Sequence, residues 1–478
     1  MPQPAPLSDS NTNTPKSLAI FGLLVAISCI SHFSVHLRAA AMSLEWLLAA
    51  SCVLASFAVL HRPNVQRILL LAGIQIAHFL ADAPFNPDHW VLLCLVHAVL
   101  LCAALRQWLR HRQIDPQQLM AQFSPGAKLI FLICYSFAAI SKFNSDFLLS
   151  DLSAAQALQQ LQVGGFPVLK YVVWPPAAPW LALICETALP ICLCVRPLRK
   201  YGITIALLFH AALILSPAVK VYDFTFAVYT MLYLFTSADF DAKLFAHIQQ
   251  FKVPAITGRI WNSLLVAGAA TILATSFDTP LMSVSTNYVV RRWQVAMVVT
   301  LIVIAAYLLT MFANSVRSDA NSKATSELNI WPKWGLPYVF VALALLNGLC
   351  PYLGLKTQGS FTMFSNLQTE AGQWNHFFMP KAMRVFDDYQ DQLVAVVSSS
   401  DKHIKTTYID RNLLATEFEI RRKIMEHPDI TLTVRENGQE IDISAESDSR
   451  LAQPLDWWQK KLLIFRPVSP DGKPFTSN

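Results

Sequence analysis

The residue whose type and position most strongly indicate chemistry is Lys142, in the stretch FAAISKFNSDF. It ends a long apolar run, and an ionisable group at membrane depth costs about 2.5–3.5 kcal/mol to insert. One interpretation is a lysine whose ammonium group reaches the lipid headgroups. The other is a buried amine that acts as a neutral base. Two features favour the second interpretation: Ala138 and Ala139 suit a close helix–helix contact, and Asn144 and Asp146 offer local polar partners.

Three further ionisable residues lie within or beside apolar runs. Glu186 in LICETALP and His210 in LLFHAALIL lie in the middle of their runs, and His89 follows Asp88 at the start of another. Taken separately, such residues are more often hydrogen-bonding partners between helices than catalysts. They acquire a chemical meaning only if the fold brings them to Lys142.

Patterns that would bind a metal are weak. His32 and His36 lie one helical turn apart but have no third ligand, so we predict packing and no metal site. The nine cysteines lie inside apolar segments without the spacing of a zinc site or a disulfide framework. We expect them to pack as small apolar side chains.

The composition indicates a membrane protein. Of 478 residues, 54% are hydrophobic and only 14% are charged, whereas soluble domains carry about 25% charged residues. The net charge of +6 does not indicate a nucleic-acid partner, because no cluster of Lys and Arg has aromatic residues interleaved for base stacking. We expect membrane lipids and a lipid-soluble substrate as partners, and no nucleic acid.

Apolar runs of membrane-spanning length recur along the chain. They are Ser17–Leu37, Met42–Leu60, Ile68–Pro84, Trp90–Leu105, Phe123–Phe143, Pro179–Val195, Tyr201–Val219, Tyr222–Thr236, Ile260–Phe277, Trp293–Ala313 and Leu336–Leu353. The expected fold class is an all-α polytopic membrane protein with about 9–11 transmembrane helices. Residues 1–16 are expected to form a disordered leader. The polar stretch LLSDLSAAQALQQLQ is predicted to be a helix on the membrane surface.

The basic residues predict an orientation. The loops with most of them hold Arg62, Arg67, Arg106, Arg110, Arg112, Arg196, Arg199, Lys200, Lys243, Lys252, Arg259, Arg317, Lys323 and Lys333. The alternate loops hold only Arg38, Lys170, Lys220, Arg291 and Arg292. This asymmetry predicts a cytoplasmic (inner) membrane protein with a cytoplasmic N-terminus and an extracytoplasmic C-terminal domain.

The sequence pattern changes after the predicted helical domain of residues 17–353: long apolar runs give way to shorter segments of mixed polarity. DQLVAVVSSSD and KKLLIFRPV resemble strands, LLATEFEIRRKIMEH an amphipathic helix, and TLTVRENGQEIDIS a hairpin that turns at Asn437-Gly438. Residues 360–478 are therefore predicted to form a small α+β extramembrane domain. It carries no catalytic motif, so we interpret it as a lid or docking surface.

Three segments resemble one known family, the vitamin K-dependent gamma-carboxylases and their bacterial relatives, which share the helical HTTM domain. YSFAAISKFNSDFL resembles the family's lysine segment, and LICETALPICLCVRPLRKYGITIALLFHAALIL resembles the next block, with a Glu before a Pro and a later Phe-His. NPDHWVLLCLV is more weakly similar to an Asn-His helix start. Together these segments cover much of residues 86–235.

The resemblance implies specific roles. It matches Lys142 to the amine that deprotonates reduced vitamin K, His89 to a histidine near the quinone, and Glu186 and His210 to supporting positions. Tyr135, Asn144, Asp146 and Tyr222 are our candidates for binding the substrate. This chain departs from the family in that Phe147 replaces a Trp, Asp88 replaces an Asn, and a single lysine stands where the carboxylases have a pair.

These departures, and a tail too small to hold a propeptide, argue against peptide carboxylation. The expected function is a membrane enzyme of carboxylase-like or quinol-oxidising type, with Lys142 as a base on a reduced quinone or another lipid-soluble substrate. One alternative is a non-catalytic partner in the maturation or export of a secreted peptide or lipid. The other is a transporter, although the sequence shows no clear internal repeat.

Overall fold

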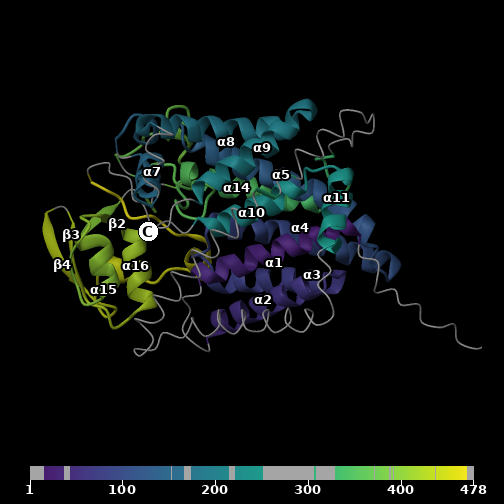
Figure 1. Ribbon diagram of the computed structural model, residues 1–478. Helices are drawn as coiled ribbons and strands as arrows, with labels where there is room; N and C mark the ends of the chain where they lie inside the picture. Colours follow the sequence, from purple (N-terminus) through teal and green to yellow (C-terminus); the bar gives the residue numbers. More distant parts are fainter. Residues whose placement is uncertain are drawn as a thin grey trace, which may run out of the picture. The chain divides into compact units, whose positions relative to one another are not determined.

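The protein is mostly helical, with a small sheet near the C-terminus (Figure 1). The computed structural model describes residues 15–36, 43–151, 153–165, 174–214, 221–250, 306–307, 310, 329–370, 372–386, 389–390, 392–436 and 438–470. The leader, the predicted span Ile260–Phe277, most of Trp293–Ala313, the loop at Lys220, the His36 side chain and Asn437 lie outside this description.

Six helices are long and apolar enough to cross a membrane, which confirms six of the predicted apolar spans as helices. They are α1 (Lys16–His36), α2 (Leu44–His61), α3 (Val65–Asp82), α4 (Asp88–His111), α5 (Pro116–Ile140) and α8 (Ala178–Cys194). Three other predicted spans form shorter helices within the described residues: α9 (Arg199–Leu213), α10 (Tyr222–Tyr233) and α14 (Pro337–Leu353). These lengths indicate a membrane protein.

The chain divides into two compact units, each described here by itself. The first comprises Met1–Ala81, Leu92–Phe131 and Ile191–Val341, and the second comprises Asp82–Val91, Leu132–Pro190 and Ala342–Asn478. The C-terminal segment Ala342–Asn478 thus belongs to the second unit, together with two segments of the helical region.

In the first unit, α1 packs against α2, α10 and α11 (Ala238–Gln250). Ser43 accepts a hydrogen bond from the Trp46 backbone and so begins α2. Arg67, in the first turn of α3, donates from its guanidinium group to the Ala58 carbonyl at 2.8 Å, which ties α3 to α2 across the short turn between them. His97 Nδ1 and Gln75 Oε1 are 3.0 Å apart and link α4 to α3. The polar side chains of Arg67, Gln75 and His97 thus form hydrogen bonds that link neighbouring helices.

In the second unit, two short helices follow the end of α5: α6 (Ser145–Leu148) and α7 (Ala154–Gly165). The second of these confirms a helix within the predicted surface stretch. The single turns η2 (Pro175–Ala177) and η3 (Arg196–Leu198, in the first unit) flank α8. Phe147, Leu148 and Leu183 form an apolar cluster between α6 and α8.

The sheet has four antiparallel strands in the order β2-β1-β3-β4. These are β1 (Leu393–Ser399), β2 (Leu414–Thr416), β3 (Leu432–Glu436) and β4 (Gln439–Ile443). Helix α16 (Glu417–Glu426) lies against the sheet, and Val394, Ile420 and Val434 are among the residues of the shared core. Strand β1, helix α16 and the hairpin between β3 and β4 confirm the predicted elements, although β2 takes the start of the predicted helix.

Shorter elements complete this region. They are η4 (Lys381–Met383), α15 (Lys402–Ile404), η5 (Lys405–Ile409), η6 (Arg450–Ala452) and α17 (Trp457–Leu462). The predicted final strand KKLLIFRPV is wrong: its first residues end α17, and only Val468 forms an isolated bridge, with Leu414. The Ile464 carbonyl accepts from the Thr357 backbone, and the Phe465 N–H donates to Glu419, so the segment pairs with a loop and a side chain.

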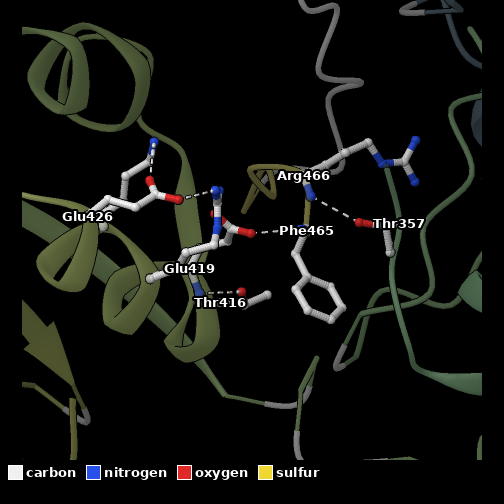
Figure 2. A network of polar contacts seen from close by, with 8 residues as sticks. Thr357, Thr416, Glu419, Glu426, Phe465 and Arg466 are labelled. Carbon is white, nitrogen blue, oxygen red and sulfur yellow. Dashed lines mark hydrogen bonds and ion pairs between the residues drawn. The ribbon is translucent and has the colours of Figure 1, made fainter. Parts of the chain in front are cut away.

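Glu419 forms the central polar contacts of the region around the sheet (Figure 2). It is buried, pairs with Arg422, and accepts a hydrogen bond from the Phe465 backbone at 2.8 Å. Burial alone would lower the pKa of Arg422, but Glu419 and then Glu426 raise it above its usual range. In Figure 2 the neighbouring Arg466 backbone donates to Thr357 at 2.9 Å, which continues the connection into the preceding loop.

We predict that Glu419→Ala destabilises the sheet region by about 3–5 kcal/mol, because the buried Arg422 loses its buried partner and keeps only the partly exposed Glu426. Hydrogen exchange of the β1 and α16 amides in the full-length protein measures this loss of protection. The matched control is Glu440→Ala, which breaks the exposed pair with Arg435 and is expected to change stability by at most about 1 kcal/mol. Equal effects of the two substitutions would contradict the assignment.

Candidate functional site

Lys142 lies in a turn directly after α5. The Lys142 and Phe143 N–H groups donate to Ala139 and Ile140, both at 3.0 Å, so the helical hydrogen-bond pattern tightens and stops. The predicted helix end at Phe143 is therefore three residues too late. Asn144 then caps α6 by accepting from the Phe147 backbone at 2.8 Å.

The Lys142 side chain is buried, with 4% of its surface exposed. Its Nζ donates to the Ala138 carbonyl at 3.2 Å and to the Met363 carbonyl at 3.0 Å. Glu186 Oε2 lies 2.7 Å from the same nitrogen. The geometry is that of an ammonium group surrounded by three acceptors inside the protein, and not of a lysine that extends to lipid headgroups.

Glu186 reaches this nitrogen from α8. Its Oε2 is buried and receives no hydrogen bond among the described residues, so the close ion pair with Lys142 is its compensation. The Phe147 ring lies 5.7 Å from the Lys142 nitrogen and belongs to the apolar cluster that it forms with Leu148 and Leu183. The low polarity of these surroundings strengthens the attraction between the two charges.

The Asn144 side chain forms hydrogen bonds through both its amide nitrogen and its carbonyl oxygen. Its amide donates to the Ser141 carbonyl at 2.7 Å and to the Ser365 carbonyl at 2.6 Å. Its carbonyl oxygen accepts from the Phe147 backbone and from Asn375 at 3.3 Å. The side chain therefore ties the Lys142 turn to the loop that follows α14.

That loop, residues 354–376, is the part of the site that sequence reasoning missed. Asn375 donates to Asp146 at 2.9 Å, and Met363 supplies an acceptor to Lys142. Phe361, Phe364 and Asn366 have positive φ angles, as do glycines of the same loop. The density of Gly and Asn in this stretch, residue types that tolerate such conformations, was the available signal.

Asp88 is bound to the same loop. Its carboxylate accepts from the Phe361 backbone at 2.6 Å, two residues before the Met363 carbonyl that binds Lys142. Cys134 on α5 lies close enough to Asp88, Glu186 and Lys142 to interact electrostatically with all three. The structure thus brings Asp88, Glu186 and Lys142 into one region of the second unit.

The remaining predicted residues are divided between the two units. His89 is buried beside Asp88 with its ring 6.5 Å from that of Trp90, and Tyr135 is buried on α5. His210 belongs to the first unit, where its ring lies 5.3 Å from that of Phe224.

Tyr222 also belongs to the first unit, and its hydroxyl is 3.2 Å from Ser34 Oγ. There too, His32 Nδ1 lies 4.0 Å from Asp223 Oδ2. His210 and Tyr222 thus belong to a different unit from Lys142.

His376 contacts the end of α5, two residues before Lys142. Its Nδ1 accepts from the Phe378 and Met379 backbones at 3.1 and 2.9 Å, and its Nε2 lies 2.8 Å from the Ile140 carbonyl. These contacts require a neutral ring with the proton on Nε2, because a protonated Nδ1 has no lone pair to offer. Burial lowers the pKa of His376, although its bond to Ile140 opposes the shift.

The chain was compared with protein-family models, with curated proteins and with solved structures, and no match was found in any of the three. The geometry of the site is therefore the basis of the functional argument.

We predict that the segment after His376 loosens as the pH falls below about 6.5, the ordinary pKa of histidine. The folded state resists protonation of His376 and the unfolded state does not, so stability is full above that pH and decreases on acidification. Protection factors of the Phe378 and Met379 amides in hydrogen exchange measure the effect. In His376→Gln, which cannot titrate, the factors should not change with pH. The same acid loss in this variant would exclude His376 as the cause.

Proposed function

We propose that the protein is an integral membrane enzyme that removes a proton from a lipid-soluble substrate, with Lys142 as the base and Glu186 as its partner. The observation that carries the proposal is the buried pair of the two side chains, 2.7 Å apart beside an apolar cluster. Buried ionisable groups with a specific charge partner are concentrated at functional sites.

The pair can handle a proton because its surroundings are apolar. In a medium of low polarity, loss of water disfavours charged groups, and the two side chains are in direct contact. One proton then passes from the Lys142 ammonium to the Glu186 carboxylate. The neutral amine takes the proton of a substrate hydroxyl: the substrate O–H bond breaks, an N–H bond forms, and the substrate leaves as an oxyanion beside the ammonium.

The residues fit a substrate of the hydroquinone class. Such a compound carries an acidic hydroxyl on a planar apolar ring, and Lys142 with the Phe147 ring offers a charged group and an aromatic group near one another. The Lys142 nitrogen already has three acceptors, so a substrate hydroxyl must replace one of them. Glu186 is the replaceable one, because it is a side chain whereas the other two acceptors are backbone carbonyls.

The resemblance to the vitamin K-dependent gamma-carboxylases and their HTTM relatives supports the same substrate class, a reduced vitamin K-like quinone. The distribution of basic residues supports a location in the cytoplasmic membrane, with about 9–11 spans and a cytoplasmic N-terminus. In that orientation the Lys142 turn faces the outer leaflet, and residues 360–478 lie outside the cytoplasm.

We predict that Lys142→Ala reduces the rate at which dissolved dioxygen oxidises a reduced quinone in the presence of the purified protein in nanodiscs by about 10²–10⁴-fold, the usual contribution of a positioned base. Glu186→Gln should also reduce turnover, because the amide cannot accept the proton. Lys128→Ala, on the same helix but in the first unit, is the control that should retain turnover. Unchanged turnover in Lys142→Ala would refute the proposal.

A non-catalytic role in handling a secreted peptide or lipid is the second candidate. It is favoured by the full set of acceptors around Lys142, which would suit a structural tie as well. Lys142→Arg separates the two candidates, since arginine keeps the charge but cannot act as a neutral base. If Lys142 is a catalytic amine, the Lys142→Arg variant loses turnover. If Lys142 only holds the surrounding elements together, the variant keeps the protein's function.

A further inference from the structure

The segment His376–Phe386 carries exposed apolar side chains that no part of the proposed chemistry uses. Phe377, Phe378, Val385 and Phe386 are 47%, 72%, 68% and 43% exposed. Side chains of this size are rarely left in water side by side unless the patch contacts a partner or a membrane.

The backbone of this segment is fixed to the ends of two apolar helices. The Phe377 N–H donates to the Phe143 carbonyl at 3.0 Å, and His376 contacts Ile140, the last residue of α5. At the other end of the segment, the Val385 and Phe386 N–H groups donate to the Leu353 carbonyl at 3.2 and 3.1 Å. Leu353 is the last residue of α14.

These contacts leave little freedom in the position of the segment. The Phe143 and Phe378 rings meet at 5.4 Å. Gly354, with a φ of +85°, lies so close to the Phe386 carbonyl that a Cβ would overlap it. The segment therefore stays at the level where α5 and α14 end. Helix α5 is long enough to cross a membrane, and α14 exposes Leu345 and Leu346 along its side.

A second group of aromatic residues lies nearby. Gln459 of α17 donates to the Tyr389 hydroxyl at 3.3 Å, three residues after Phe386. Trp457 and Trp458 on this helix are exposed, and Lys460 and Lys461 follow them. Lys381 in the first segment is exposed as well. Exposed aromatic side chains with interspersed lysines at the ends of apolar helices are typical of the boundary between lipid tails and headgroups.

We propose that His376–Phe386 is an interfacial anchor that inserts Phe377, Phe378, Val385 and Phe386 into the bilayer in which α5 and α14 end. The bilayer is the occupant that fits, because the patch is continuous with the ends of these helices and its exposed cation suits anionic headgroups. The inference concerns the placement of this loop and does not depend on the proposed proton chemistry. It places the Lys142 turn, one residue before Phe143, beside the lipid phase.

Spin labels on the full-length protein in nanodiscs test this placement. Cys102, Cys185, Cys192 and Cys194, the native cysteines that are not buried, are first replaced by serine. A label is then attached at Phe378→Cys or Val385→Cys, and at Gln439→Cys on the exposed edge strand β4 as the matched control. The discs contain phosphatidylcholine with phosphatidylglycerol, and label collisions are measured with oxygen, which concentrates in lipid, and with a water-soluble nickel chelate.

The expected result is a several-fold higher ratio of oxygen to nickel collisions at positions 378 and 385 than at 439. Ratios equal to that of the control would place the segment in water and overturn the proposal. Protection from both reagents would overturn it too, because the patch would then be covered by protein. Both labelled side chains are largely exposed. Phe378→Cys gives up the ring contact with Phe143 whereas Val385→Cys keeps it, so the two positions guard against a single failed variant.

Discussion

A charged amine inside an apolar region is stable only if acceptors replace the water that it has lost. The Lys142 ammonium meets this requirement with the Ala138 and Met363 carbonyls and with Glu186. Each acceptor comes from a different element: the end of α5, the loop after α14, and α8. One nitrogen thus fixes where three distant parts of the chain meet, and removing any acceptor would leave an uncompensated buried charge.

The loop of residues 354–376 exists in its irregular form for the same reason. In a regular helix or strand the backbone carbonyls accept hydrogen bonds from the backbone of the same element. The Met363 and Ser365 carbonyls would then not be available to Lys142 and Asn144. The positive φ angles at Phe361, Phe364 and Asn366 direct backbone groups toward Asp88, Lys142 and Asn144 instead. Asn144 and Asn375 then hold the loop against the turn. Strained backbone and the candidate site thus coincide here, and such strain is concentrated at active sites of other proteins.

Much of the helical architecture could be predicted, because twenty-residue apolar runs have few alternatives in a membrane. The hairpin with Gly438 at its turn was likewise a local signal. The end of α5 could not be placed, since it depends on Asn144 capping the next helix. The strand predicted for KKLLIFRPV failed because its backbone bonds to Thr357 and Glu419, partners that no local pattern reveals.

The candidate site divides in the same way. Lys142 and Glu186 were identified from their position in apolar runs, where an ionisable residue is costly. Their pairing could not be derived from sequence spacing, because α6 and α7 separate the turn after α5, which holds Lys142, from α8, which holds Glu186. Met363, Asn375 and His376 were not identified at all: they act through backbone carbonyls, an amide and a neutral imidazole, groups common to every loop.

The central claim is that Lys142 and Glu186 exchange a proton within a buried pair. Isotope-edited infrared spectroscopy of the Glu186 carboxyl tests it most directly, with Glu186→Gln to assign the band. The account predicts an ionised carboxylate in the resting protein and a protonated carboxylic acid when a reduced quinone binds. A carboxylate that remains ionised while the substrate is bound and turned over would contradict it.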